Sequence, residues 1–152
     1  YSTQFLTDTD LQSMALYLQS QAQAAVPMPK LAVKSRAVLP DVATRGAKIY
    51  EQHCAQCHGE QGQGQAGAYP SLAGHRAVLQ KDTTNLVQTV LYGGYPPATL
   101  GNPRPFGMPP YILTLDDKDM AAVLTHLRTQ WGNHAPEVTP LEVNRIRASQ
   151  GS

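Results

Sequence analysis

Residues Cys54–His58 read CAQCH, two cysteines separated by two residues with a histidine directly after the second. This is the spacing at which a c-type haem is attached to a polypeptide. On one helical turn, both thiols can form thioether bonds to one edge of a porphyrin while the imidazole turns toward the iron. The motif therefore predicts one haem c, bound covalently through Cys54 and Cys57, with His58 as an axial iron ligand.

Two other uses of a CxxC pair are disfavoured. A zinc site of this type needs a second pair of ligands at similar spacing, and the chain contains only two cysteines. A thioredoxin-like redox motif would stand near a βαβ pattern, whereas this sequence alternates helical patterns with loops. Covalent haem remains the favoured interpretation.

The composition is typical of one domain that encloses a cofactor. The chain has 152 residues, of which 7% are aromatic, 12 are glycine and 12 are proline. This length is enough for one domain around a haem, but a core of protein alone would be thin. A buried porphyrin would supply the missing apolar mass. The net charge of +1, without a stripe of Lys and Arg, argues against nucleic acid as a partner.

The sequence also bears on location. It has no run of about 18 apolar residues, so we expect no transmembrane segment in this chain. Tyr1 opens into polar, helix-like sequence rather than a signal peptide. Because thioether attachment is completed after export, we expect a periplasmic protein whose targeting segment lies upstream. The chain is then a fragment or a processed product of a longer one.

Apolar periodicity predicts helices at residues 7–21, 42–53, 82–91 and 115–130. Gly46 lies inside the second of these, where glycine costs about 1 kcal/mol relative to alanine. Its presence predicts the close approach of another helix. The natural partner is the last predicted helix, which has a continuous apolar face.

The first and last predicted helices resemble each other. Residues 6–21 can be laid over residues 115–130 at a constant offset of 109, with five identities in sixteen positions. The identical pairs are Leu6/Leu115, Asp8/Asp117, Asp10/Asp119, Leu18/Leu127 and Gln21/Gln130. Two unrelated amphipathic helices could share such a pattern. We favour the interpretation that residues 1–26 are the closing helix of a preceding haem domain.

The remaining segments follow from this division. Residues 27–40 contain Pro27, Pro29 and Pro40, and prolines at this density predict an extended linker. Residues 41–133 form the haem domain, and residues 134–152 are a C-terminal tail. Within the tail, residues 138–146 could either drape over the domain or be disordered.

The sixth iron ligand has several candidates among the methionines. Met14 and Met120 stand in apolar helical stripes, where methionine is core by default, and Met28 lies in the predicted linker. Met108 follows Gly107 in a loop over residues 92–111 that is rich in glycine and proline, and a long loop of this kind inside a compact domain is usually functional. Met108 has no helical face to fill, so we favour it as the ligand.

The histidines are the competing ligands. His53 is tethered beside Cys54, which should keep it from crossing the haem, and His126 is expected to be a partly exposed surface residue. His75 and His134 are expected to have packing or surface roles. With Met108 bound, the iron has no open position, so electron transfer is favoured over catalysis, and no catalytic residue is expected.

Two loops near the motif complete the predicted site. The glycine-rich loop over residues 59–67 lacks the Lys-Ser/Thr ending of a phosphate loop, and we expect it to let the backbone pass close to the haem. Pro70 offers a carbonyl that can accept a hydrogen bond from the second ring nitrogen of His58. Such a bond fixes the ring of a metal-ligating histidine.

The order of these parts resembles the class I cytochrome c fold: an all-α fold of three to five helices around one covalently bound haem, here with an extra N-terminal helix. The resemblance runs from about Pro40 to Asn133. The stretch from Thr84 through the Gly-Gly-Tyr-Pro-Pro loop to Asn133 resembles the last haem domain of the trihaem cytochrome subunits of membrane-bound periplasmic dehydrogenases of the alcohol and aldehyde type. The departure is that this chain holds one haem motif.

The resemblance implies roles for particular residues. The carbonyl of Pro70 would bond His58, Pro70 and Leu72 would contact the haem, and Met108 would be the distal ligand. The helix with Gly46 and Tyr50 would cross the C-terminal helix of the domain.

It also implies a role for the chain as a one-electron relay, passing electrons from a dehydrogenase toward quinone or a terminal acceptor. Its partners would be a dehydrogenase subunit, neighbouring haem domains, and a quinone or oxidase, with membrane association through the parent complex. Residues 1–21, without their own domain, could also pack in a swapped or dimeric arrangement. The alternative is a haem enzyme or small-ligand sensor, such as a peroxidase, with a displaceable sixth ligand.

Overall fold

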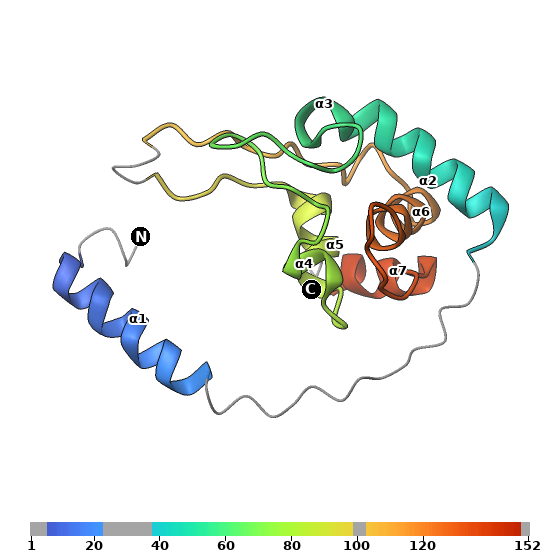
Figure 1. Cartoon of the computed structure of the whole chain (residues 1–152). Coiled ribbons are helices and arrows are strands. Elements are labelled where there is room, and N and C mark those ends of the chain that lie inside the picture. The colour runs from blue at the N-terminus through green and yellow to red at the C-terminus, as the bar shows by residue number, and fades with distance from the viewer. Residues whose placement is uncertain (1–5, 23–37, 99–102, 150–152) are drawn as a thin grey trace. The chain divides into compact units, whose positions relative to one another are not determined.

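The computed structural model describes residues 6–22, 38–98 and 103–149 (Figure 1). These residues contain seven α-helices and two isolated β-bridges, and no extended strand occurs among them. The helical content confirms the predicted all-α class. The chain divides into two compact units, residues 1–33 and 34–152. Met28 and most of the predicted linker lie outside the described residues.

The first unit contains helix α1, Asp8–Ala22, close to the predicted range. Thr7 caps it: the backbone N–H of Asp10 donates to Thr7 Oγ1 over 3.2 Å, and the backbone N–H of Thr7 donates to Asp10 Oδ2 over 3.0 Å. The apolar side chains Leu11, Met14 and Leu18 are exposed. The apolar stripe that predicted packing is therefore present on α1, but no other described residue of the same unit covers it.

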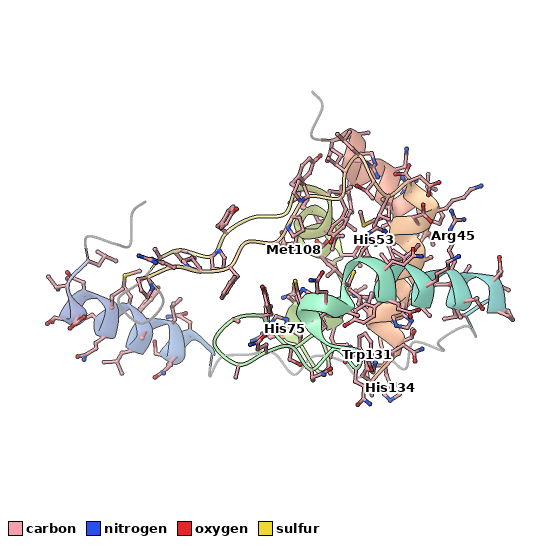
Figure 2. All side chains as sticks on the ribbon, turned by 90° about the horizontal axis from the view of Figure 1, so that it is seen from above. Arg45, His53, His75, Met108, Trp131 and His134 are labelled. Atoms are coloured by element: carbon pink, nitrogen blue, oxygen red, sulfur yellow. The ribbon has the colours of Figure 1, made fainter. Side chains whose placement is uncertain are left out.

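The second unit is organised by helices α2, Pro40–His53, and α6, Asp117–Thr129. They pack at Gly46, where a Cβ would overlap the carbonyl oxygen of Ala122 and lie 3.0 Å from the Cβ of His126. Arg45 projects from α2 beside the start of α6 and pairs with Asp119 at 2.7 Å (Figure 2). The predicted helix crossing at Gly46 is confirmed.

Three helices lie between these two in the sequence. Helix α3, Ala55–His58, and helix α4, Arg76–Leu79, are single turns. Helix α5, Thr84–Tyr92, has a buried face formed by Leu86, Val87, Val90 and Leu91. These side chains join the apolar face of α6 in one hydrophobic cluster. Cys54 and Ala55 of the CxxCH segment pack against this cluster.

The C-terminal segment contains a helix that periodicity did not reveal. Helix α7, Pro140–Ala148, begins with a capping box in which Thr139 and Glu142 bond reciprocally. Val143 is fully buried. Arg147 pairs with Asp117 at 2.8 Å and also donates to the carbonyl oxygens of Ile112 and Leu115. Of the two alternatives for residues 138–146, the structure shows the packed one; residues 150–152 lie outside the described part.

None of the seven helices described has both the length and the hydrophobicity required to cross a lipid bilayer.

Candidate haem site

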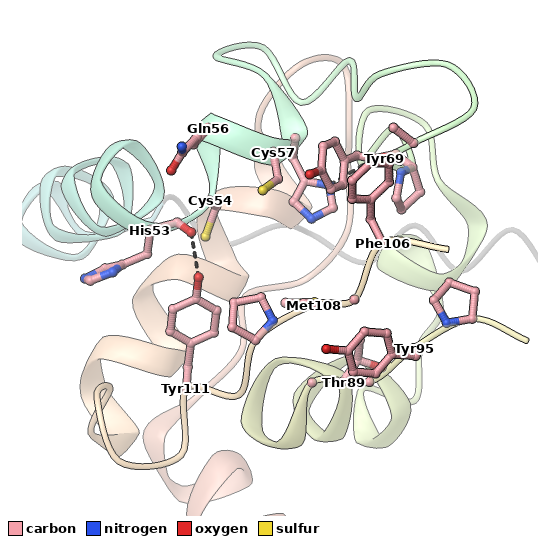
Figure 3. A pocket seen from close by; sticks show the side chains of 18 residues that line it. His53, Cys54, Gln56, Cys57, Tyr69, Thr89, Tyr95, Phe106, Met108 and Tyr111 are labelled. Carbon is pink, nitrogen blue, oxygen red and sulfur yellow. Dashed lines mark hydrogen bonds between the residues drawn. The ribbon is translucent and has the colours of Figure 1, made fainter. Parts of the chain in front are cut away.

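The CxxCH segment lies on a turn directly after α2. The chain leaves the α2 geometry at Cys54, with φ −120° and ψ −36°, and resumes it in α3. The backbone N–H of His58 donates to the carbonyl of Cys54 over 2.9 Å. Both sulfur atoms point into one pocket, with Met108 on its far side (Figure 3). The turn thus gathers the two thiols and the imidazole at one wall.

The ring of His58 is fixed by a hydrogen bond. Its Nδ1 lies 2.9 Å from the carbonyl oxygen of Pro70. A carbonyl can only accept, so Nδ1 carries the proton and Nε2 keeps a free lone pair. This is the tautomer and the orientation that a metal-ligating histidine requires.

The loop after His58 packs closely against its surroundings, and Gly62 makes this packing possible. Gly62 has φ +63°, and a Cβ there would come within 2.7 Å of the ring of Trp131. The carbonyl of Gly62 accepts from the backbone N–H groups of Leu72 and Ala73, over 2.7 and 3.0 Å. Gly62 therefore lets the loop approach Trp131 and the segment after Pro70. The sequence did not predict this contact.

Met108 is held without a helix. Gly94 and Met108 form an isolated antiparallel bridge with N···O distances of 3.0 and 2.8 Å. Gly93, with φ +62°, approaches so closely that a Cβ would overlap the carbonyl of Met108. Just beyond, the hydroxyl of Tyr111 donates to the carbonyl of His53 over 2.7 Å, as the dashed line in Figure 3 shows. This bond ties the Met108 loop to the end of α2.

Two adjoining cavities surround these groups. The larger, about 390 Å³, lies between the CxxCH turn and the loop with Tyr95, Phe106 and Met108. The smaller, about 170 Å³, extends inward to Leu72 and to Val123, Leu124 and Leu127 of α6. Both are lined by Cys54, His58, Pro70, Thr89 and Met108. The shared residues make the two cavities parts of one apolar space with His58 and Met108 at its walls.

This donor set fits a haem and disfavours other uses of the thiols. Burial, and secondly the neighbouring Cys57, raises the pKa of the Cys54 thiol to about 11. A reactive dithiol requires a thiolate at neutral pH, so the free thiol of Cys54 is poorly suited to that role. Across the part of the chain that the structure describes, no three His, Cys, Asp or Glu side chains gather as a metal site.

Two of the competing ligands, His53 and His75, also line this apolar space, and each makes another contact there. Met120 is fully buried in the hydrophobic cluster, and Met14 is exposed on α1. His75 lines the smaller cavity, but its Nδ1 accepts a hydrogen bond from the backbone N–H of Ala77 over 3.2 Å and so caps α4. His134 is exposed, beyond Trp131 in Figure 2. His53 lines the larger cavity but packs edge-on against Tyr111, with ring centroids 5.7 Å apart.

His126 has a more specific environment than the sequence predicted. Its ring lies 5.4 Å from that of Tyr50 and 5.2 Å from that of Trp131, and these two rings are 4.8 Å apart. Burial lowers the pKa of His126 below its ordinary value of 6.5. The residue is partly exposed, as expected, but it lies at the crossing of α2 and α6 between two aromatic rings.

Arg128 is a buried cation that sequence reasoning missed. Its side chain is only 1% exposed, yet it follows Leu127 in a helix and carries no motif. Its guanidinium donates to the carbonyls of Val78, Gln80 and Pro136, over 2.6, 2.8 and 2.7 Å. It therefore joins α4 and the C-terminal segment to α6 behind the smaller cavity.

The fold and the site together define a haem-binding class of electron carriers, and sequence comparison agrees. The profile of the family described as Cytochrome c matches residues 43–131. This range contains the CxxCH turn, the Met108 loop, all of α6 and α2 from residue 43 onward. The chain belongs to the cytochrome c family, whose members transfer electrons through covalently bound haem c.

Individual relatives narrow the comparison. The cytochrome c subunit of the quinone alcohol dehydrogenase of Gluconobacter oxydans is 34% identical over 98% of this chain but only 32% of its own length. The gluconate 2-dehydrogenase cytochrome c subunit of Pantoea cypripedii is 31% identical over 99% of this chain and 35% of its own length. The chain thus spans about a third of the length of these relatives. Cytochrome c-552 of Thermus thermophilus is 40% identical over 69% of this chain and 86% of its own length.

Proposed function

We propose that this chain carries single electrons on one haem c, attached through Cys54 and Cys57 and ligated by His58 and Met108. The observation that carries the proposal is the shared cavity, into which the CxxCH turn and Met108 project from elements far apart in the sequence. When bound, haem supplies a one-electron iron couple whose potential is raised by Met/His ligation.

The protein's own residues hold and shield this group. Pro70 keeps the proton of His58 on Nδ1, and so keeps Nε2 available for iron. The Gly94–Met108 bridge presents the thioether rigidly, which suits a weak ligand. Leu72 and the apolar face of α6 line the inner cavity and exclude water from it. With His58 and Met108 both bound to the iron, no position there would remain for a substrate.

The relatives support a place in an electron-transfer chain. Their names describe cytochrome c subunits of alcohol and gluconate dehydrogenases. We extend this to the present chain: it relays electrons from a dehydrogenase toward quinone or a terminal acceptor. Its partners are then a dehydrogenase subunit and neighbouring haem domains, in the periplasm and at the membrane through the parent complex.

The helix α1 supports the idea of neighbouring haem domains. It begins at Asp8 and α6 begins at Asp117, so the two starts keep the offset of 109 residues. Each N-cap side chain, Thr7 or Asp116, accepts from the backbone N–H three residues later. The buried face of α6 is Met120, Val123, Leu124 and Leu127, and its counterparts in α1 are Leu11, Met14, Ala15 and Leu18, which are exposed. This agreement favours residues 1–26 as the closing helix of a preceding domain.

Sedimentation tests whether α1 packs in a swapped or dimeric arrangement. A closing helix without its domain should make the chain self-associate through its exposed apolar face, in a swapped or dimeric form. Removing residues 1–26, or replacing Leu11 and Leu18 by Glu, should abolish the association. The matched control replaces Gln12 and Gln19 by Glu on the same helix. Identical monomeric behaviour of all four proteins would reject the swapped or dimeric packing.

A redox titration of the haem-loaded protein tests the electron-carrier function. The wild-type protein should give one reversible one-electron wave, and Met108→Ala should lower its midpoint potential, with Met120→Leu as the control. A haem enzyme or ligand sensor would instead bind peroxide or another small ligand in the wild-type protein and would retain its activity in Met108→Ala. That result would contradict the proposal.

A further inference from the structure

Asn133, just beyond the end of α6, makes an unusual set of contacts. Its side chain is 1% exposed. Its Oδ1 accepts from the backbone N–H of Gly74 over 2.8 Å. Its Nδ2 donates to the carbonyl of Leu127 over 2.7 Å and to that of Leu72 over 3.1 Å. One buried amide therefore joins the end of α6 to the loop over residues 72–74.

The chain is bent to bring this amide inward. Trp131 has φ +54°, in the left-handed region that a non-glycine residue rarely occupies, and Gly132 follows with φ +80°. Backbone strain of this kind persists where surrounding contacts fix it. The contacts here are the packing of Trp131 on Tyr50 and the three hydrogen bonds of Asn133.

The segment to which Asn133 bonds, residues 72–74, follows Pro70 closely in the sequence. Leu72 lies two residues beyond Pro70, whose carbonyl accepts from His58 Nδ1. The position of that carbonyl depends on how the loop is attached to the rest of the domain. The bonds to Gly62 attach it to the segment after His58, while Asn133 attaches it to α6, which also forms the inner wall of the cavity.

We propose that Asn133 is a positioning residue, which sets the hydrogen bond between His58 and Pro70 and through it the reduction equilibrium of the haem. The inference rests on the proposed function for His58. A shorter bond at Nδ1 makes the imidazole more basic, and a more basic ligand favours ferric iron. Loss of the three hydrogen bonds of Asn133 should lengthen the bond between His58 and Pro70 and shift the equilibrium toward ferrous iron.

The test compares Asn133→Ala with Thr125→Val in the haem-loaded protein. Thr125 is a matched control, because it is also 1% exposed and bonds to backbone, exchanging two hydrogen bonds with Val138. It lies on α6 and makes no hydrogen bond to the Pro70 loop. The first readout is solvent exchange of the His58 Nδ1 proton, followed by NMR in the reduced protein. The second is the reduction equilibrium constant against a reference dye.

Asn133→Ala should speed the exchange of the His58 proton by about tenfold or more and favour the ferrous form by about threefold or more. Thr125→Val, at a comparable loss of stability, should leave both quantities within about twofold of wild type. Equal effects of the two variants would overturn the proposal, because they would reflect stability alone. The proposed function fails separately, through the absence of a reversible wave in wild type.

A second measurement needs no variant. In the wild-type protein, the Gly74 amide proton and the His58 Nδ1 proton should exchange through the same opening, with equal opening free energies as denaturant is raised. If the His58 proton exchanges while the Gly74 amide proton stays protected, Asn133 does not control the hydrogen bond between His58 and Pro70, and the proposal is wrong.

Discussion

Gly46 on α2 lies directly against the carbonyl group of Ala122 on α6, and a Cβ on Gly46 would be 2.9 Å from the carbonyl carbon. This contact lets the two helices cross closely. Gly46→Val should destabilise the domain by about 2 kcal/mol or more, since the helices must separate. Ala47→Val, on the exposed side of α2, should cost less than about 1 kcal/mol. Equal unfolding free energies of the two variants, measured in denaturant, would disprove the tight crossing.

Arg128 should be important for stability, although no carboxylate among the described residues lies at salt-bridge distance from it. Arg128→Met removes the donor for three carbonyl groups, on Val78, Gln80 and Pro136. Hydrogen bonds to charged groups contribute about 1.5–3 kcal/mol each and are not additive, so we expect a loss of about 3 kcal/mol. The exposed Arg145→Met on α7 is the control and should change the unfolding free energy by less than about 0.5 kcal/mol. A similarly small change for Arg128→Met would contradict the contacts described.

Helix α7 should be an integral part of the haem domain. Val143→Ala deletes two buried methyl groups and should destabilise the domain by about 2 kcal/mol. Leu141→Ala, at an exposed position of the same helix, should be nearly neutral. Thermal unfolding of both variants distinguishes a packed helix from a loosely attached tail, for which neither change would matter.

His126 should make stability depend on pH. Burial lowers its folded-state pKa below 6.5, so the unfolded chain binds more protons than the folded one as the pH falls below that value. Stability should therefore decrease from about pH 7 downward until the folded-state pKa is passed, by about 1.4 kcal/mol per unit of pKa difference. His126→Phe keeps the aromatic packing and should show a flatter pH profile between about pH 7 and 5. Parallel profiles for the two proteins would refute the role of His126.

The sequence predicted those parts of the fold that are encoded locally. Residues 54–58 carry their chemistry in their spacing, and the glycine at position 46 has few explanations other than a close neighbour. Met108 stood out because its loop offers no helical face. Each of these signals can be read within one turn or one loop.

Other parts depend on contacts between distant segments. Arg128 and Asn133 look like ordinary polar residues at a helix end, and their burial results from where residues 72–80 and 136 lie. Helix α7 has no broad apolar stripe, because the buried side chain of Val143 and the hydrogen bonds of Arg147 attach it to the domain. Its apolar pattern in the sequence is therefore weak. His126 needs Tyr50 and Trp131, which are separated by 81 positions in the printed numbering.

The most direct test of the account is the absorption spectrum of the oxidised, haem-loaded protein in the far red, where a weak band reports thioether sulfur bound to ferric iron. We predict that the band is present in the wild-type protein, is lost in Met108→Ala and is retained in Met120→Leu. A wild-type protein without the band, or a band that survives in Met108→Ala, would contradict ligation by His58 and Met108.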